Sequence, residues 1–335
     1  MRNPRLIVAG LLACALATTA ACGTAAGSGS DSLTVGMSSP VMAQEGQQAL
    51  ADGFTAAAAS LGWGERVYDA NLSADTQVSN VQTMVAQNNA AIAAWALDDG
   101  AISGAYAGAR AANIPVVGIN SAGSGVTTSV WWEVNTCEAG GTVEKLAQLF
   151  ATAKPGGNIA IISGPPAPSI VALTECFTAA AEQAGLTVVA RQDNTQDSSA
   201  GASALAQDLL SAHPDLDGFW AYNDASALGI SSAILASGRT VHSGTNGDGL
   251  VVTGVNGDSA AITAVRNGTV TATVDTDPAC TGWAVVGAMQ SAVQDAGATP
   301  ERYVVRSAIV DSAAVGSFVA PADRTCSLTD LPLVD

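Results

Sequence analysis

The sequence of 335 residues is poor in basic residues. Lysine and arginine together number 12, against 29 acidic residues, and the formal net charge is −17. A protein with such a charge repels phosphate backbones and anionic lipid headgroups. We therefore expect no nucleic-acid partner.

Patterns that carry catalysis or bind metals are also scarce. The chain has two histidines, His213 and His242, and its cysteines do not follow the CxxC spacing of zinc sites. The sequence contains no GxSxG elbow and no P-loop pattern. No acidic residue stands at a spacing from His213 that indicates a catalytic triad. We therefore expect a protein that is not an enzyme and that holds no metal and no cofactor.

Hydrophobic sequence is abundant, at 48% of residues, and it occurs in short runs between alanine-rich segments of helical period. The runs are at 33–37, 91–95, 114–119, 158–163, 186–190, 219–222 and 251–255. The helical segments are near 44–61, 75–89, 100–112, 137–152, 170–184, 200–212, 225–237, 258–267 and 280–296. Strands that alternate with helices indicate an α/β protein with parallel sheets and right-handed crossovers, and this number of elements indicates two sheets.

The amino terminus is typical of an export signal. Arg2 and Arg5 precede the apolar segment 6–17, and the small residues TTAAC follow at 18–22. This order of a basic, an apolar and a small-residue region is that of a secretory signal peptide. We expect residues 1–21 to be removed on export.

The end of this segment, TAAC, resembles the lipobox of bacterial lipoproteins, in which the cysteine becomes the lipidated first residue of the mature protein. The resemblance implies a lipid on Cys22 and a flexible tether over 22–32. It places the protein on the outer face of the cytoplasmic membrane. Cleavage at Cys14, or cleavage without lipid, is the alternative, because Thr19 stands where the lipobox prefers leucine.

The residues that follow the apolar runs share a chemical character. In open parallel sheets ligands bind beyond the carboxyl ends of the strands, so these positions are the candidate site. Short polar side chains and one indole occupy them. They are Ser38, Ser39, Asp69, Asn71, Trp95, Asp98, Asn120, Ser163, Asp193, Asn223, Asp224, Asn256 and Asp258.

Several stretches in a fixed order resemble a known family. They are QVSNVQTMVAQN (77–88) followed by AIAAWALD, then AANIPVVGIN (111–120), EVNTCEAGG (133–141), LLSAHPDLDGFWAYNDASALG (209–229), VVTGVNGD (251–258) and VRNGTVTATVDTDP (265–278). As an ordered set they resemble the type I periplasmic solute-binding proteins of the ribose-binding-like family, which deliver sugars to ABC importers. The resemblance implies two doubly wound parallel-sheet lobes joined by three crossing strands, with the ligand held between the lobes.

On this resemblance the crossings fall near 133–136, 275–278 and 309–312. The N-terminal lobe then comprises 33–134 plus 277–310. The C-terminal lobe comprises 135–276 plus 311–335.

The family's pocket residues lie on the loops after the strands, and the resemblance implies that Asn223 faces the cleft and binds the solute. Asn120 and Asn256 stand where the family has aspartates, and an amide keeps hydrogen-bonding capacity while it removes charge. Ser39, Trp95 and Asn135 complete the expected ligand-binding set.

Most of these residues also have a structural interpretation. Asn223 and Asp224 are both suited to cap the following helix, and of the two we expect Asp224 to be the cap. Asn135 is a candidate cap for the helix expected over 137–152. Trp95 either stacks on a sugar face or packs in the core. Of the pair Trp131–Trp132, one side chain can face the cleft while the other packs on the hinge.

The arginines that sugar binders of this family usually carry are missing. The corresponding regions read SIVALTECF (169–177) and DNTQDSSAG (193–201), without a cation. A bidentate guanidinium clamp for carboxylates or ring hydroxyls is therefore absent from these positions. We expect a small neutral sugar or polyol as the ligand.

Four cysteines remain when the signal is removed and Cys22 carries lipid. An even number in an oxidising compartment predicts two disulfides, for which three connectivities exist. We favour Cys137–Cys176, near consecutive helices of one lobe, and Cys280–Cys326, which would pin the carboxyl-terminal tail.

These inferences lead to an exported, lipid-anchored, monomeric solute-binding component of an ABC importer. Its partners would be a small neutral sugar or polyol and a membrane permease. The alternative is a sensory receptor that presents its closed form to a membrane signalling partner.

Overall fold

The computed structural model describes residues 33–244, 247–295, 297 and 299–334. The expected signal peptide, the anchor Cys22 and the tether lie outside these residues. Two six-stranded sheets organise the described chain, and we call each sheet with its helices a lobe.

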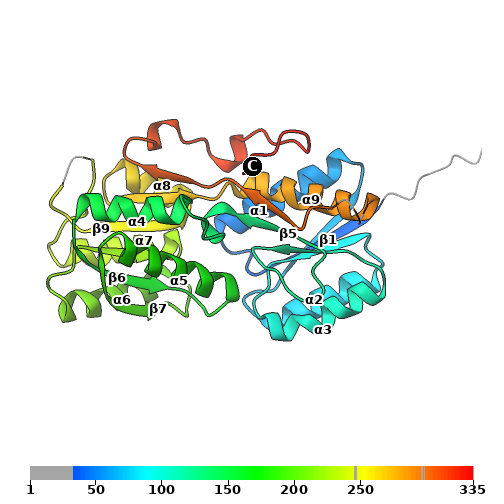
Figure 1. The fold of residues 1–335 in the computed structure, drawn as a ribbon, viewed down its shortest axis with the longest axis horizontal. Helices are drawn as coiled ribbons and strands as arrows, with labels where there is room; N and C mark the ends of the chain where they lie inside the picture. The colour runs from blue at the N-terminus through cyan, green and yellow to red at the C-terminus, as the bar shows by residue number, and fades with distance from the viewer. Residues whose placement is uncertain (1–32, 245–246, 296, 298, 335) are drawn as a thin grey trace, which may run out of the picture. The chain divides into compact units, whose positions relative to one another are not determined.

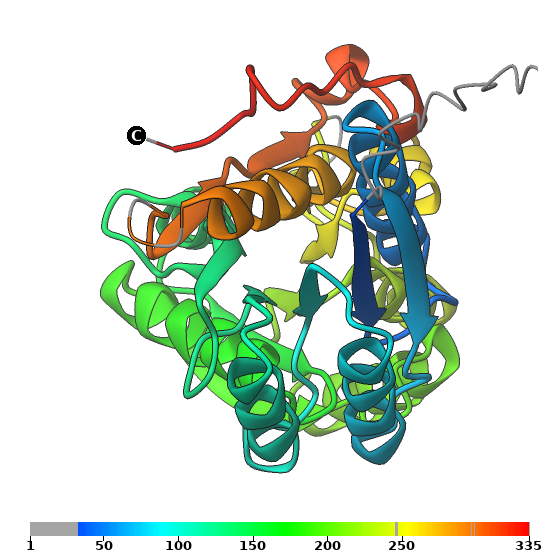
Figure 2. The same cartoon turned by 90° about the vertical axis from the view of Figure 1, so that its right-hand side faces the viewer.

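The first lobe is built on the strand order β11-β5-β4-β3-β1-β2, with every neighbouring pair parallel. Its strands are β1 (Thr34–Ser39), β2 (Gly64–Asp69), β3 (Ala91–Ala94), β4 (Val116–Ile119), β5 (Thr128–Trp132) and β11 (Arg302–Val305). Its helices are α1 (Glu45–Ser60), α2 (Ala74–Ala86), α3 (Asp99–Ala111) and α9 (Pro278–Gln294). In both views α1 and α9 lie on one face of this sheet and α2 and α3 on the other (Figures 1 and 2).

Burial on both faces explains why its strands read as continuous apolar runs. In β3, Ala91 and Ala93 belong to the core under α1 and α9, whereas Ile92 and Ala94 belong to the core with α2 and α3. Successive side chains of a strand point to opposite faces, so each residue of the run packs into one core or the other and has to be apolar.

The second lobe repeats this plan with the order β12-β10-β9-β8-β6-β7. Its strands are β6 (Asn158–Ser163), β7 (Thr187–Asp193), β8 (Gly218–Ala221), β9 (Val251–Asn256), β10 (Ala272–Asp275) and β12 (Ala308–Asp311), of which β12 is antiparallel to β10. Its helices are α4 (Thr142–Ala153), α5 (Pro168–Gln183), α6 (Ser199–Ala212), α7 (Asp224–Ala236) and α8 (Ser259–Arg266). Short 3-10 turns lie at η1 (Glu133–Asn135), η2 (Val315–Ser317) and η3 (Pro321–Asp323). The expected fold class, two doubly wound lobes with predominantly parallel sheets, is confirmed.

Two glycines allow α1 and α9 to approach closely. A Cβ atom on Gly53 would lie 2.0 Å from the carbonyl oxygen of Ala279, and one on Gly282 would lie 2.2 Å from that of Leu50. Both distances are far below any van der Waals contact, so a larger residue at either position would push the helices apart. These glycines set the distance between the two helices.

Three short segments join the lobes, and the third differs from the expected position. The chain crosses after β5 through η1, between β10 and α9 at 276–277, and between β11 and β12 at 306–307. The third crossing therefore precedes 309–312, because β12 pairs with β10 in the second sheet. At this hinge the Glu133 carboxylate accepts from the backbone N–H of Ser307 at 3.2 Å, which joins the first and third crossings.

The carboxyl-terminal tail also departs from the expected division, which assigned 311–335 to the second lobe. After η2, which packs beside α8, the tail returns to the first lobe. Leu328, Leu331 and Leu333 pack against the first core, and the N–H of Val334 donates to the carbonyl of Val304 at 2.8 Å. Apolar side chains in the last residues thus cover the first core and take the chain across the hinge a fourth time.

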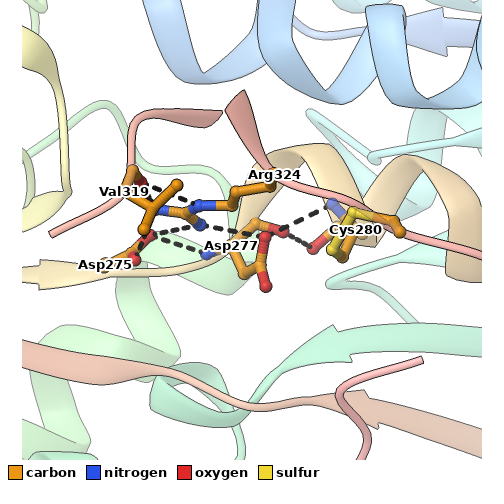
Figure 3. Close-up of a disulfide and its surroundings, with 7 residues drawn as sticks. Asp275, Asp277, Cys280, Val319 and Arg324 are labelled. Carbon is orange, nitrogen blue, oxygen red and sulfur yellow. Dashed lines mark hydrogen bonds and ion pairs between the residues drawn. A yellow bond between two sulfur atoms is a disulfide. The ribbon is translucent and has the colours of Figure 1, made fainter. Parts of the chain in front are cut away.

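Arg324 holds this tail to the second crossing (Figure 3). Its guanidinium forms ion pairs with Asp275 at 2.7 Å and with Asp277 at 2.9 Å, and it also donates to the carbonyl of Val319. The side chains are largely buried, with exposed fractions of 11% for Arg324, 15% for Asp275 and 18% for Asp277. Burial raises the pKa of Asp275, and the nearby guanidinium opposes that rise.

Both favoured disulfides are present in the structure. Cys137 is bonded to Cys176, with Cα atoms 5.8 Å apart, and Cys280 is bonded to Cys326, with Cα atoms 5.4 Å apart. Asp277 lies near the second pair, but sulfurs bonded to each other are not thiolate ligands, so this cluster is a disulfide. No helix in the described part of the chain has the length and hydrophobicity needed to span a membrane.

Candidate ligand-binding site

A cavity lies between the lobes, where loops from the carboxyl ends of both sheets meet. Side chains of both lobes line it: Pro40, Val41, Gln44, Gln47, Leu72, Trp95, Ala96, Leu97, Trp132, Asn135, Pro165, Ala167, Ser169, Ile170, Leu173, Asp197, Tyr222, Asn223, Val255 and Asn256. In this conformation its volume is about 80 Å³. Ligand pockets typically measure roughly 300–1,000 Å³, so a sugar-sized ligand needs the lobes to separate further.

Hydrogen bonds across the cleft account for the narrow cavity. Gln44, which precedes α1 in the first lobe, donates from Nε2 to Oδ2 of Asp197 in the second lobe. Beside it the Glu45 carboxylate accepts from the backbone N–H of Ser259 at 3.1 Å and from its hydroxyl at 2.8 Å. The structure therefore shows the lobes closed on each other.

Trp95 is one of the residues that bridge the lobes. It follows β3, its indole N–H donates to Oγ of Ser169 in the second lobe at 2.9 Å, and its ring lies edge-on to Trp132, with centroids 4.7 Å apart. Trp132 is buried, and its indole N–H donates to the hydroxyl of Thr281 at 3.1 Å. Trp95 thus lines the cavity and also packs against the hinge, while stacking on a sugar stays a prediction.

Asn223 caps a helix and also lines the cavity, while its contact with a ligand stays a prediction. Its Oδ1 accepts from the backbone N–H of Ser226 at 2.9 Å, which makes it the N-cap of α7, while its Nδ2 donates to Asp197 at 2.8 Å at the cavity wall. The expectation that Asp224 is the cap is wrong. Asp224 is the first residue of α7, and its fully buried carboxylate accepts from Thr273 and from the backbone of Asp258.

Asn135 and Asn256 also line the cavity. Asn135 lies in η1, and its buried Oδ1 has no hydrogen-bond partner among the described residues. It does not cap the next helix, which begins at Thr142 instead of 137. Cys137, at φ 58°, breaks the chain direction, and the Glu133 carboxylate instead accepts from the backbone N–H and hydroxyl of Thr142.

Ser39 and Asn120 are not among the residues that line the cavity. The Ser39 hydroxyl donates to Oε1 of Gln47, which does line it, at 3.1 Å. The Asn120 Oδ1 accepts from the backbone N–H of Trp132 at 2.7 Å and so holds the loop after β4 against β5. In this conformation both residues bond to residues that line the cavity without lining it themselves.

Carboxylates gather on the second-lobe side of the closed cleft. Burial raises the pKa of Asp258 to about 6, and the neighbouring Glu45 carboxylate of the first lobe adds to the shift. Burial also raises the pKa of Asp224 well above its usual range, with Asp258 as the second cause. The pKa of Asp197 is raised by burial and held back by the amides of Asn223 and Gln44.

Several cavity residues were missed by sequence reasoning. Gln44 and Gln47 follow β1 by several residues, beyond the strand-end positions that were considered. Asp197 lies within 193–201, a segment singled out only for its lack of arginine. Its position in a loop directly after β7 was the available signal. Ser169, Ile170 and Leu173 are on α5, whose first turn reaches the cavity from a helix rather than from a strand end.

A family profile described as "Periplasmic binding protein domain" matches residues 35–297. The chain belongs to the periplasmic binding protein family. This is a family of transport binding proteins and not of enzymes.

A curated member of the periplasmic binding protein family is similar over part of the chain. The ribose import binding protein RbsB of Bacillus subtilis (strain 168) is 32% identical over 181 residues, which are 52% of this chain and 56% of that protein. The match therefore spans about half the length of this relative.

Solved periplasmic binding proteins share the fold over most of both chains. An ABC transporter solute binding protein from Mycobacterium smegmatis with bound glycerol is 26% identical, with a TM-score of 0.74, over 86% of this chain and 97% of that chain. The Caulobacter myo-inositol binding protein bound to myo-inositol is 19% identical, with a TM-score of 0.75, over 85% and 95%. A periplasmic solute binding protein from Actinobacillus succinogenes 130z with bound D-allose is 20% identical, with a TM-score of 0.74, over 85% and 100%.

Proposed function

We propose that the protein is the extracytoplasmic solute-binding component of an ABC importer, and that it binds a small neutral sugar or polyol between its lobes. The observation that carries the proposal is the interlobe cavity. Its polar lining consists of amides, hydroxyl groups and one carboxylate, and no lysine or arginine of the described residues lines it. Burying an anionic ligand without a cation costs several kcal/mol, whereas hydroxyl groups need only hydrogen bonds.

Relatives of the same fold support this ligand class, since the solved structures above contain glycerol, myo-inositol and D-allose. The aromatic lining supports it as well. Trp95, Trp132 and Tyr222 offer apolar faces with polar edges, which suits a ring that carries both C–H groups and hydroxyls.

The mechanism is a population shift between open and closed lobes. A ligand that contacts both lobes binds the closed form more tightly and so increases its population. In the structure Gln44, Glu45 and Trp95 of the first lobe bond to the second lobe, and a sugar held between the lobes would replace those of these contacts that lie at the cavity wall. A membrane permease would then recognise the closed surface of the monomer.

The proposal includes an anchor at Cys22, on the outer face of the cytoplasmic membrane. It rests on the TAAC segment and on the family, whose members act outside the cytoplasm. Mass spectrometry of the mature amino terminus from a lipoprotein-processing host should show a lipidated Cys22. An unmodified Cys22 peptide would rule the anchor out.

Calorimetry on a panel of pentoses, hexoses, cyclitols and short polyols tests the ligand class, with mass spectrometry of co-purified material to guide the choice. At least one neutral compound should bind, and Trp95 and Trp132 should report closure through a change in tryptophan fluorescence. Asn135→Ala should weaken binding by about five- to hundredfold, because it removes a buried acceptor available to the ligand. A panel without a binder, or an Asn135→Ala protein that binds as well as the parent, would contradict the proposal.

A further inference from the structure

Asp197 is the one charged side chain among the described residues that line the cavity. It lies in the loop between β7 and α6, with φ 48°, so the chain turns sharply there and directs this residue toward the cleft. Sequence reasoning assigned it no role. Its position raises the question of what a single carboxylate does in a site for uncharged ligands.

Donors from both lobes hold this carboxylate in place. Oδ1 accepts from the Tyr222 hydroxyl and from Nδ2 of Asn223 at 2.8 Å, and both residues belong to the second lobe. Oδ2 accepts from Nε2 of Gln44 of the first lobe. Because its own lobe fixes Oδ1, the variable contact is the one at Oδ2, between the lobes.

Asp197 lines the cavity, so a ligand in the cavity would lie against this residue. When the lobes open, the contact between Gln44 and Oδ2 is lost, and Oδ2 becomes free to accept from a ligand donor. Partial burial shields the carboxylate from water, and burial is the main reason why its pKa is raised. A charge with little solvent around it acts strongly on other charges nearby.

We propose that Asp197 is a specificity-determining residue that requires a hydrogen-bond donor from the ligand at this wall and excludes ligands with a negative charge. The proposal rests on the function proposed above and assigns its charge preference to one residue. A hydroxyl-bearing ligand can donate to Oδ2, whereas a uronic acid or a sugar phosphate would place a second anion beside it. Like charges brought together in this way are a common means of rejecting wrong partners.

Asp197→Asn tests the assignment, because it removes the charge and keeps the shape. The measured quantity is the ratio of dissociation constants between the uronic acid and the neutral form of the best sugar, at about pH 8 to keep the carboxyl groups ionised. In the parent protein we expect the acid to bind at least about a hundredfold more weakly, and in Asp197→Asn we expect this ratio to fall by about tenfold or more. The neutral sugar should bind Asp197→Asn only a few-fold more weakly.

Asp193→Asn is the matched control. Asp193 is four positions earlier, at the end of β7, is exposed and does not line the cavity, so the same charge is removed from the protein without a change in the site. Its ratio should equal that of the parent. Thermal melting checks that each variant is folded, and Asp197→Ser serves if the asparagine variant is not.

The outcomes separate the two proposals. A ratio that is unchanged in Asp197→Asn, or reduced equally in Asp193→Asn, overturns the role of Asp197 while neutral sugars still bind. If no sugar or polyol binds the parent, the proposed function is wrong and the assignment to Asp197 fails with it.

Discussion

Asn223 makes two contacts that act on different properties of the protein. Its Oδ1 caps α7, which affects folding stability, and its Nδ2 orients the Asp197 carboxylate, which affects the site. The two atoms of one amide can therefore be tested separately.

Asn223→Ser separates these effects, because serine caps helices as well as asparagine does but lacks the Nδ2 donor. We expect its stability to stay within about 0.5 kcal/mol of the parent, while ligand affinity falls by about fivefold or more. Asn223→Ala should lose both properties, with about 1 kcal/mol of stability lost with the cap. Urea unfolding and calorimetry measure the two quantities. Equal ligand affinity in the parent and both variants would show that Nδ2 has no part in the site.

At the scale of elements, the tail depends on a buried ion-pair cluster. Arg324→Ala would leave Asp275 and Asp277 buried beside each other without their cation. Removing one partner of a buried pair typically costs about 3–5 kcal/mol, so we expect a loss of that order in the free energy of unfolding.

The matched control is Arg302→Ala, which removes the exposed pair with Glu138, where the two side chains are 46% and 45% exposed. Such surface pairs contribute about 0–1 kcal/mol. Denaturant unfolding with the disulfides intact compares the two variants. Similar losses for Arg324→Ala and Arg302→Ala would mean that the tail is not held by this cluster.

The burial of a helix or strand affects whether its sequence pattern can be recognised. The nine helices of the described residues could be located from their alanine-rich helical period, and the apolar runs located β1, β3, β4, β6, β7, β8 and β9. The short strands β5, β10, β11 and β12 were not among these runs. β2 escaped notice because it is an edge strand with only partly buried residues, GERVYD. The return of the tail could not be predicted, because leucines such as Leu328 and Leu331 do not indicate which lobe they will cover.

The site was only partly predictable for a related reason. Asn135, Asn223, Asn256 and Trp95 follow strands or lie in a motif, so position along the chain indicated them. Asp197 enters the cavity through a turn with positive φ, and such a turn in a non-glycine residue leaves little trace in sequence.

At the scale of the whole molecule, closure brings Glu45 of the first lobe near Asp258 of the second. The pKa of Asp258 is raised to about 6 from 3.8, by burial first and by Glu45 second. A carboxyl group with a raised pKa binds more protons in the folded protein than in the unfolded chain between these two values. Its contribution to stability is therefore complete below pH 3.8 and is lost as the pH rises through about 6.

Asp258→Asn removes this dependence. We expect the variant to gain stability relative to the parent as the pH rises from about 4 to about 7, by at most about 3 kcal/mol. Glu45→Gln should change the parent's profile in the same direction by less, since Glu45 is the smaller cause. Urea unfolding at several pH values gives the difference in stability. A difference between Asp258→Asn and the parent that is constant over this range would contradict the assignment.

The close approach of α1 and α9 at Gly53 and Gly282 has a mechanical consequence. Because backbone lies against backbone there, we expect the two helices to move together as one arm. One end of this arm, at Pro278, adjoins the second crossing, and another end, at Glu45, bears the contacts that close the cleft. We therefore expect a rotation at Asp277 to displace Gln44 and Glu45 along with α9, which would couple bending at the hinge to the breaking of the contacts that close the cleft.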